Sequence, residues 1–142
     1  MALPTVSELL VRVNYSEVDQ MGVVYHARYV VWLDMARTEH LRLAGTSYRE
    51  VEESGYRFAV GELTVRFRRP ARYDDLVRVR CWVREVASRR VTFGYAIEDS
   101  ASGALLATAS TAMMVLDAGM APARLPEPIR ALLVPVADPV RL

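Results

Sequence analysis

The stretch Tyr15–Tyr29, YSEVDQMGVVYHARY, holds the side chains best suited to chemistry in this chain. It contains a carboxylate at Asp19, a turn glycine at Gly22 and a tyrosine–histidine pair at Tyr25 and His26. The pattern that follows predicts a long apolar helix, and a helix start carries free backbone N–H groups that can receive a developing anion. A carboxylate beside such a start indicates acid–base or nucleophilic chemistry on a carbonyl group.

The same residues also admit structural roles. A carboxylate in a loop ahead of a helix often caps the helix or is solvated, and a histidine at a helix start can cap, pack or polarise a ligand. Glu17 lies two residues before Asp19, so in an extended chain the two side chains point apart and do not share a proton. Spacing alone therefore leaves Asp19 and His26 open between catalysis and structure.

Other common kinds of site find no support in the sequence. The only two histidines, His26 and His40, do not have H-x-x-x-H spacing, and no C-x-x-C is present. The motifs of serine hydrolases, dinucleotide-binding proteins and P-loop proteins are also absent. Cys81 falls in the inward phase of an apolar strand, where we expect inert packing. The sequence therefore predicts no metal ion and no cofactor.

The composition is that of a single globular domain covering residues 1–142. The apolar fraction is 52% and the charged fraction 25%, and a chain of 142 residues can bury a core without disulfides. A net charge of +1 gives no general attraction to nucleic acid, and no apolar run approaches the roughly 18 residues of a membrane span. A single cysteine and the lack of a signal-peptide pattern predict a cytoplasmic protein.

The pattern predicts two helices after a first strand. The first helix runs from about 27 to 44, is apolar on nearly every side in its first half, and meets Gly45 as its stop. Such a helix must be covered, most simply by a sheet that curls around it. Ser47 with Glu50 three residues later predicts a second, short helix that Gly55 ends.

Beyond residue 55 the apolar residues alternate, which is typical of strands. Four strands in succession predict an antiparallel sheet, and a change of phase at Gly61 indicates a β-bulge. Trp82 falls in the outward phase and is expected to be exposed. A short C-terminal helix is expected at about 127–134. The fold class is therefore α+β, with five antiparallel strands curved around a long central helix.

Half of the positive charge is concentrated in one part of the chain. All eighteen basic residues are arginines, and nine of them lie between Arg66 and Arg90 against three acids. One interpretation is a solvated sheet face. The other is a shallow site for a multiply phosphorylated ligand, because a guanidinium binds phosphate through two parallel hydrogen bonds. Nucleic acid is disfavoured, because the basic residues are not interleaved with aromatic ones.

Together these residues resemble the signature of the 4-hydroxybenzoyl-CoA thioesterase family of hotdog-fold proteins. Its pattern is roughly Y-x-D-x-D-x-x-G-x-x-Y-H/N-x-x-Y, which Tyr15–Tyr29 follows except that Glu17 stands where the family usually has Asp. The family's A-R-x-E is Ala36–Glu39 here, and the Arg69–Asp75 turn is similar to the family's strand connection. The resemblance covers about residues 8–116.

The resemblance implies a helix wrapped by a five-stranded sheet, paired into homodimers or homotetramers with an acyl-CoA site at the dimer interface. Asp19 matches the family's catalytic aspartate, and the amide of His26 matches the backbone donor to the thioester oxygen. Gly22, which lets the loop pass close, and Tyr25 are assigned to substrate binding. The outer tyrosines of the motif, Tyr15 and Tyr29, are assigned to packing.

The CoA phosphates are assigned to Ser88, Arg89 and Arg90, which occupy the corresponding turn of the family. The predicted activity is hydrolysis of an acyl-CoA thioester to a free acid and CoA, with Asp19 as general base or nucleophile. The sequence leaves open a non-catalytic acyl-CoA-binding protein and a thioesterase for acyl carrier protein. It also leaves open whether the acyl group is short, long or aromatic.

Overall fold

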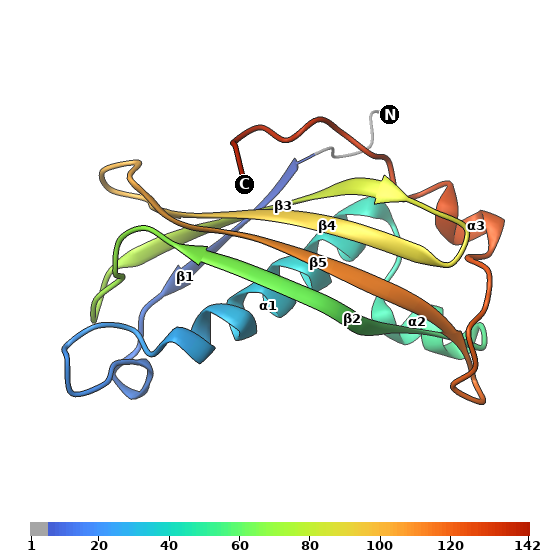
Figure 1. The fold of residues 1–142 in the computed structure, drawn as a ribbon, viewed down its shortest axis with the longest axis horizontal. Coiled ribbons are helices and arrows are strands. Elements are labelled where there is room, and N and C mark those ends of the chain that lie inside the picture. Colours follow the sequence, from blue (N-terminus) through green and yellow to red (C-terminus); the bar gives the residue numbers. More distant parts are fainter. Residues whose placement is uncertain (1–5) are drawn as a thin grey trace.

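The computed structural model describes residues 6–142, in which the two predicted helices separate a first strand from four further strands (Figure 1). The last helix is a single turn and is shorter than the expected 127–134. Pro135 limits its length, because a proline disfavours helical conformation in the residue before it. In chain order the elements are β1 (Val6–Arg12), a 3-10 turn η1 (Tyr15–Glu17), α1 (His26–Ala44), α2 (Tyr48–Glu53), β2 (Tyr56–Phe67), β3 (Leu76–Val86), β4 (Arg90–Asp99), β5 (Leu105–Asp117) and α3 (Glu127–Arg130).

The five strands form one antiparallel sheet in the order β1-β3-β4-β5-β2, so β1 and β2 are its edges. The sheet curves, and α1 lies along its inner face (Figure 1). The predicted α+β class with five antiparallel strands and a long central helix is confirmed. Large side chains of the helix and of the inner face fill the core, among them Trp32, Leu33, Phe93, Tyr95 and Ile97.

The ends of the two main helices are at the predicted residues. Gly45 adopts φ 104°, a left-handed conformation that favours glycine, and its N–H bonds to the Arg42 carbonyl at 3.1 Å. Ser47 caps α2, because its hydroxyl accepts a hydrogen bond from the Glu50 N–H at 3.1 Å. These local signals therefore fix where the helical layer ends and where β2 begins.

The β-bulge predicted at Gly61 is confirmed, since the pairing of β2 with β5 shifts between Val60 and Glu62. A Cβ at Gly61 would lie 2.7 Å from the Met114 side chain, so only glycine fits against this neighbour without a shift. Because the bulge adds a residue, Val60 and Leu63 both point to the inner face of the sheet. Both stay more than a third exposed at this edge.

The sheet does not wrap α1 completely, which differs from the sequence-based expectation. Val30, Val31 and Met35 on α1 are 38%, 45% and 41% exposed. Val30 and Val31 face Val60 and Leu63 across a cavity between α1 and β2. We call these five side chains the α1–β2 apolar surface. It remains open because β2, the last strand of the sheet, has no neighbour on its outer side.

Trp82 is fully buried, so the expectation that it is exposed is wrong. The segment after α3 returns across β3, where the Val136 N–H bonds to the Val83 carbonyl at 2.9 Å. The Asp138 carboxylate accepts a hydrogen bond from the Trp82 indole N–H at 2.9 Å. Gly94 on β4 makes room for the indole, because a Cβ there would lie 2.6 Å from the ring. The C-terminal segment thus covers this part of the outer face.

Candidate active site

Asp19 lies at the first position of a tight turn between η1 and α1. Its N–H bonds to the Val23 carbonyl, and the Gly22 N–H bonds to the Asp19 carbonyl, both at 2.9 Å. Gly22 has φ +76°, which explains why glycine stands here. The exposed Asp19 carboxylate accepts one hydrogen bond, from the Met21 N–H at 2.9 Å. Its second oxygen makes no hydrogen bond within residues 6–142 and can contact a water or a substrate.

The first turn of α1 offers unpaired backbone donors. Tyr25 is the N-cap and provides no side-chain hydrogen bond, and the amides of His26 and Ala27 have no acceptor in the described part of the chain. The exposed rings of Tyr25 and His26 lie side by side with their centroids 4.5 Å apart and their planes tilted by 54°. Because a helix start is electropositive, these open N–H groups can stabilise a carbonyl oxygen that develops negative charge.

A cavity of about 250 Å³ opens beside this helix start. Its walls are mostly apolar and include two arginines. Four neighbouring residues are predicted to form the site, and His26 is the one among them that lines this cavity. Asp19, Gly22 and Tyr25 lie in the adjoining turn and N-cap. The lining residues are Val23, Val24, His26, Tyr29, Phe67, Arg68, Arg69 and Pro70.

Glu17 anchors the Asp19 turn to α1, a role that sequence reasoning misses. One carboxylate oxygen accepts a hydrogen bond from the Asn14 N–H at 2.9 Å, and the other accepts one from the Trp32 indole at 2.8 Å. Trp32 is fully buried, so its partner is held rigidly. The Glu17 side chain thus reaches from the turn to the helix. No local pattern indicates this pairing, because the two residues lie fifteen positions apart.

The connection between β2 and β3 supplies a second anchor at Ala71. The Val24 N–H bonds to the Ala71 carbonyl at 2.8 Å, and the Tyr29 hydroxyl accepts a hydrogen bond from the Ala71 N–H at 3.1 Å. Tyr29 is 3% exposed, which confirms its predicted packing role. Tyr15, also expected to pack, is 78% exposed and lies edge-on to Tyr73. The packing prediction for Tyr15 is therefore wrong.

The turn Ser88–Arg90 lies at the opposite end of the sheet from the start of α1 (Figure 1). Arg90 pairs with Met114, which pairs with Ala59 on β2, whereas Phe67 at the far end of β2 lines the cavity at the helix start. At about 3.3 Å per residue, Ala59 and Phe67 are about 26 Å apart along the strand. One chain therefore does not bring the predicted phosphate contacts to the predicted catalytic residues.

A second cavity of about 420 Å³ follows the first along α1, between this helix and β2. Leu33 and four members of the α1–β2 apolar surface supply its apolar lining. Asp34, Arg37 and Thr111 supply the polar part. The cavity is thus an apolar space with a limited set of hydrogen-bonding groups, which is typical of small-molecule sites.

Arg37 holds this polar part in place. Its buried guanidinium donates to the Tyr48 hydroxyl, to the Tyr95 hydroxyl at 3.0 Å and to the Asp34 carboxylate at 2.7 Å. Burial raises the pKa of Tyr95, so its hydroxyl stays protonated near neutral pH, and it shares a hydrogen bond of 2.7 Å with the Thr111 hydroxyl. This buried cation, with a hydrogen-bond partner at each of its three nitrogens, fixes α1 against α2 and β4.

A buried serine–histidine pair resembles a nucleophile with its base but has a structural role. The Ser7 hydroxyl lies 2.8 Å from His40 Nδ1 and 3.2 Å from the Cys81 carbonyl. All three residues are buried in the core. Burial also raises the pKa of the Cys81 thiol, so no thiolate forms near neutral pH. The prediction that Cys81 is inert packing is confirmed.

In the His40→Gln variant, the free energy of unfolding is expected to fall less on acidification than it does in the wild type. Burial lowers the pKa of His40 below its ordinary 6.5, so the unfolded chain takes up a proton at higher pH than the folded chain. The contribution of neutral His40 to the free energy of unfolding is fully present above pH 6.5. It is lost as the pH falls below 6.5, by at most about 1.4 kcal/mol per pH unit. Urea unfolding of both proteins between about pH 7.5 and 5.5 measures this difference, and parallel pH profiles would contradict the prediction.

Comparison with known proteins identifies the superfamily of the chain. The model of a family described as the Thioesterase-like superfamily matches residues 13–133. The chain belongs to this superfamily. Within residues 6–142, no three histidine, cysteine or acidic side chains are grouped to hold a metal ion. The described helices include none that is long and apolar enough to cross a membrane.

Individual relatives resemble the chain over most of its length. Acyl-CoA thioesterase YbgC of Haemophilus influenzae is 35% identical over 123 residues, which cover 85% of this chain and 89% of that protein. The solved structure of hypothetical protein TT1821 from Thermus thermophilus is 41% identical, with a TM-score of 0.83 and coverage of 92% and 97%. DHNA-CoA thioesterase from Staphylococcus aureus is 30% identical, with a TM-score of 0.81 and coverage of 86% and 82%. These similarities confirm the hotdog fold.

Proposed function

We propose that the chain is a cytoplasmic thioesterase of the 4-hydroxybenzoyl-CoA thioesterase type, which hydrolyses acyl-CoA to a free acid and CoA. One observation carries the proposal: the uncapped start of α1, with open amides at His26 and Ala27, borders a cavity and adjoins the turn that holds Asp19. Relatives named for the hydrolysis of CoA thioesters support the substrate class.

In the proposed reaction the thioester oxygen accepts hydrogen bonds at the start of α1, chiefly from the His26 amide. One such donor is worth about 3–4 kcal/mol, and the helix dipole adds about 0.3–1 kcal/mol. In one route Asp19 takes a proton from a water as the water oxygen adds to the carbonyl carbon. The C–S bond then breaks, and the departing CoA thiolate is protonated. In the other route Asp19 itself adds, the thiolate leaves, and water hydrolyses the mixed anhydride.

The remaining motif residues have supporting roles in this proposal. Gly22 closes the turn that holds Asp19 ahead of the helix. The exposed ring of Tyr25 lies next to that of His26, where both can contact the substrate. The second cavity along α1 would hold the acyl group. Its apolar lining suits aliphatic and aromatic groups alike.

We place the complete site between two copies of the chain. β2 is a twelve-residue edge strand, and a long, apolar, exposed edge is uncommon in a protein that works as a monomer. The α1–β2 apolar surface lies next to this edge. Antiparallel pairing of two β2 strands would join the two sheets and cover the exposed apolar side chains. The homodimer, alone or doubled into a homotetramer, is therefore part of the proposal.

The same pairing would complete the substrate site. A two-fold axis through the middle of β2 exchanges the two ends of the strand. It would therefore move the Ser88–Arg90 turn of the second copy to the end of the joined sheet where α1 of the first copy begins. The CoA phosphates could then contact one chain while the thioester contacts the other.

Changing both Arg89 and Arg90 to Ala is expected to raise KM for acyl-CoA about tenfold and to leave kcat near the wild-type value. The reason is that phosphate contacts far from the carbonyl stabilise bound substrate and transition state equally. Steady-state rates at low ionic strength measure the effect, because salt screens exposed charges. A loss confined to kcat would contradict the phosphate-binding role.

Release of free thiol, followed with a thiol reagent, tests the proposed function. The substrates are short, long and aromatic acyl groups on both CoA and acyl carrier protein. The second carrier is included because a relative named acyl-acyl carrier protein thioesterase ATL3 of Arabidopsis thaliana is 31% identical over 127 residues. Turnover of acyl-CoA supports the proposal. Turnover of acyl groups on acyl carrier protein alone would show that acyl carrier protein, and not CoA, is the carrier of the substrate. Binding without thiol release would indicate a non-catalytic acyl-CoA-binding protein.

A further inference from the structure

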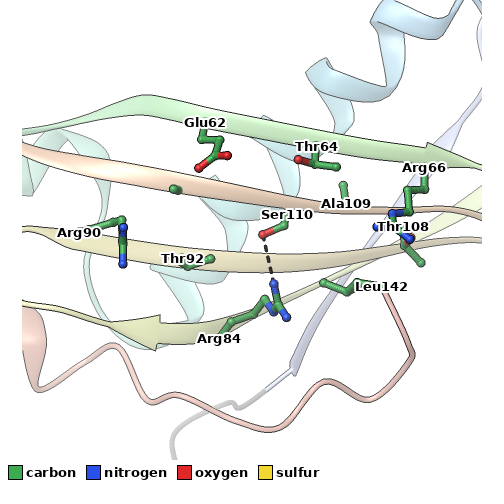
Figure 2. Close-up of a pocket in the computed structure, with 11 residues that line it drawn as sticks. Glu62, Thr64, Arg66, Arg84, Arg90, Thr92, Thr108, Ala109, Ser110 and Leu142 are labelled. Atoms are coloured by element: carbon green, nitrogen blue, oxygen red, sulfur yellow. Dashed lines mark hydrogen bonds between the residues drawn. The ribbon is translucent and has the colours of Figure 1, made fainter.

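The outer face of the sheet, opposite α1, carries a trough of about 380 Å³ (Figure 2). It shares only Arg90, which lies at one end, with the proposed thioesterase site. The trough exists because β4 and β5, in the middle of the sheet, present mostly small side chains on this face, while β3 and β2 on either side of this pair present longer ones. The small residues on β5 are Thr108, Ser110 and Ala112. The long residues are Glu62 and Arg66 on β2 and Arg84 on β3.

One row across this face holds two buried polar atoms without partners. In the sheet register Arg66 lies opposite Thr108, Thr108 opposite Ala96, and Ala96 opposite Arg80. Thr108 is 1% exposed, and its hydroxyl has no hydrogen-bond partner in the described chain. The Nε atom of Arg80 is also buried and unpartnered there. Because buried polar groups are normally paired, the unpartnered Thr108 hydroxyl, which belongs to a residue that lines the trough, indicates a ligand there.

Arg66 adds a cation at the same end of the trough. Figure 2 shows its side chain beside Thr108, with Glu62 and Arg90 farther along. Within residues 6–142 no acidic side chain forms an ion pair with Arg66. Directly opposite residues of antiparallel strands have Cβ atoms about 4.5–5.5 Å apart. One oxyanion can therefore accept hydrogen bonds from both the Thr108 hydroxyl and the Arg66 guanidinium.

Arg80 lies in the same row, on the other side of Ala96. Ala96 is fully buried, and neither it nor Arg80 lines the trough. The terminal nitrogen of Arg80 makes a 3.7 Å ion pair with Glu98, which leaves Nε available. The trough thus presents the Thr108 hydroxyl and the Arg66 guanidinium, two donors that fit the acceptor oxygens of a phosphate, and Arg80 adds positive charge to the same row.

The rest of the trough is polar but less basic. Arg84 is held by Asp138 through two contacts of 2.9 Å. Glu62 disfavours an anion at its own end, and the hydroxyls of Thr64, Thr92 and Ser110 line the space between. No aromatic side chain of the described chain lines the trough, so a nucleobase would find no stacking partner. The ligand should carry its charge at one end and hydroxyl groups along the remainder.

We propose that this trough binds a small hydroxylated phosphate monoester, such as a sugar phosphate. The phosphate accepts hydrogen bonds from the Thr108 hydroxyl and the Arg66 guanidinium. The hydroxyl groups of the ligand extend along Ser110 and Thr64. The site lies on the opposite face of the sheet from α1. It is separate from the proposed thioester chemistry and does not depend on it.

Titration of the whole chain with inorganic phosphate and with glycerol 3-phosphate tests the proposal, by calorimetry and by amide chemical shifts. Saturable binding with shifts at Thr108 and Ala96 is expected. Thr108→Val and Arg66→Gln should each weaken binding about tenfold. Without ligand, T108V should be at least as stable as the wild type, because the hydroxyl that it removes is unpaired. The control substitutions Thr46→Val and Arg124→Gln lie outside the trough and should keep wild-type affinity.

Three results would overturn the proposal. The first is the absence of saturable binding, or wild-type affinity in both trough variants. The second is a set of shifts confined to the start of α1 and the Ser88–Arg90 turn. The third is a raised KM for acyl-CoA in both T108V and R66Q, which would assign the trough to the phosphates of CoA. With a separate site, both variants keep KM and kcat within about twofold of the wild type.

Discussion

Asp19→Asn is expected to lower kcat for acyl-CoA hydrolysis by about 10²–10⁴-fold, the usual contribution of a positioned acid–base group. An amide neither takes a proton from water at neutral pH nor adds to a thioester carbonyl. The fold should persist, because Asp19 is exposed and the Asn side-chain oxygen can still accept the hydrogen bond from the Met21 N–H. Rates of thiol release and melting temperatures, measured on the same preparations, test both statements.

The matched control is Gln20→Ala, which alters the adjoining exposed side chain of the same turn. It should keep kcat near the wild-type value, because Gln20 makes no side-chain hydrogen bond to the turn within residues 6–142. Undiminished turnover in D19N would remove Asp19 from the mechanism. An equal loss in both variants would show that disturbance of the turn, and not loss of the carboxylate, lowers the rate.

The features of the fold that depend on neighbouring residues are predictable from the sequence. Gly45 ends α1 because it can adopt a left-handed conformation, and the phase change at Gly61 is a β-bulge in the structure. The same holds for the core of the site. Asp19, Gly22, Tyr25 and His26 lie in one continuous stretch, so a turn followed by a helix start must bring them near one another.

Contacts between distant segments are not predictable in this way. Alternation places Trp82 on the outer face, but it contains no information that Asp138, fifty-six residues later, returns to cover the indole. The hydrogen bond from Trp32 to Glu17 and the bonds of Ala71 to the start of α1 are hidden for the same reason. The unpartnered Thr108 hydroxyl emerges only when the register of four strands is known.

The site itself is incomplete in one chain for a related reason. Along the sequence, nothing indicates that the Ser88–Arg90 turn and the α1 start lie at opposite ends of the sheet. Their separation of about 26 Å along β2 follows from strand register and strand rise. Either a second copy brings the two together, or the turn takes no part in substrate binding. Breaking the contact between copies decides between these possibilities.

Leu63→Arg is expected to separate the copies and to lower kcat/KM for acyl-CoA by at least about 10²-fold, the scale on which misplaced binding groups reduce a rate. Leu63 belongs to the α1–β2 apolar surface and is 39% exposed in the single chain. A guanidinium there is solvated in the monomer but would be buried without a partner in the dimer. The fold should therefore survive while the association fails. Light scattering after size exclusion and rates of thiol release measure both effects.

Leu10→Arg is the matched control, because Leu10 is an apolar side chain, 55% exposed, on the other edge strand β1. It should keep the oligomeric state and the activity of the wild type. An L63R protein that remains dimeric would place the contact elsewhere on the molecule. A monomeric L63R with undiminished kcat/KM would show that one chain holds the whole site. The distance along β2 would then exclude Ser88, Arg89 and Arg90 from binding the CoA phosphates, and leave Arg68 and Arg69 beside His26 as the nearer candidates.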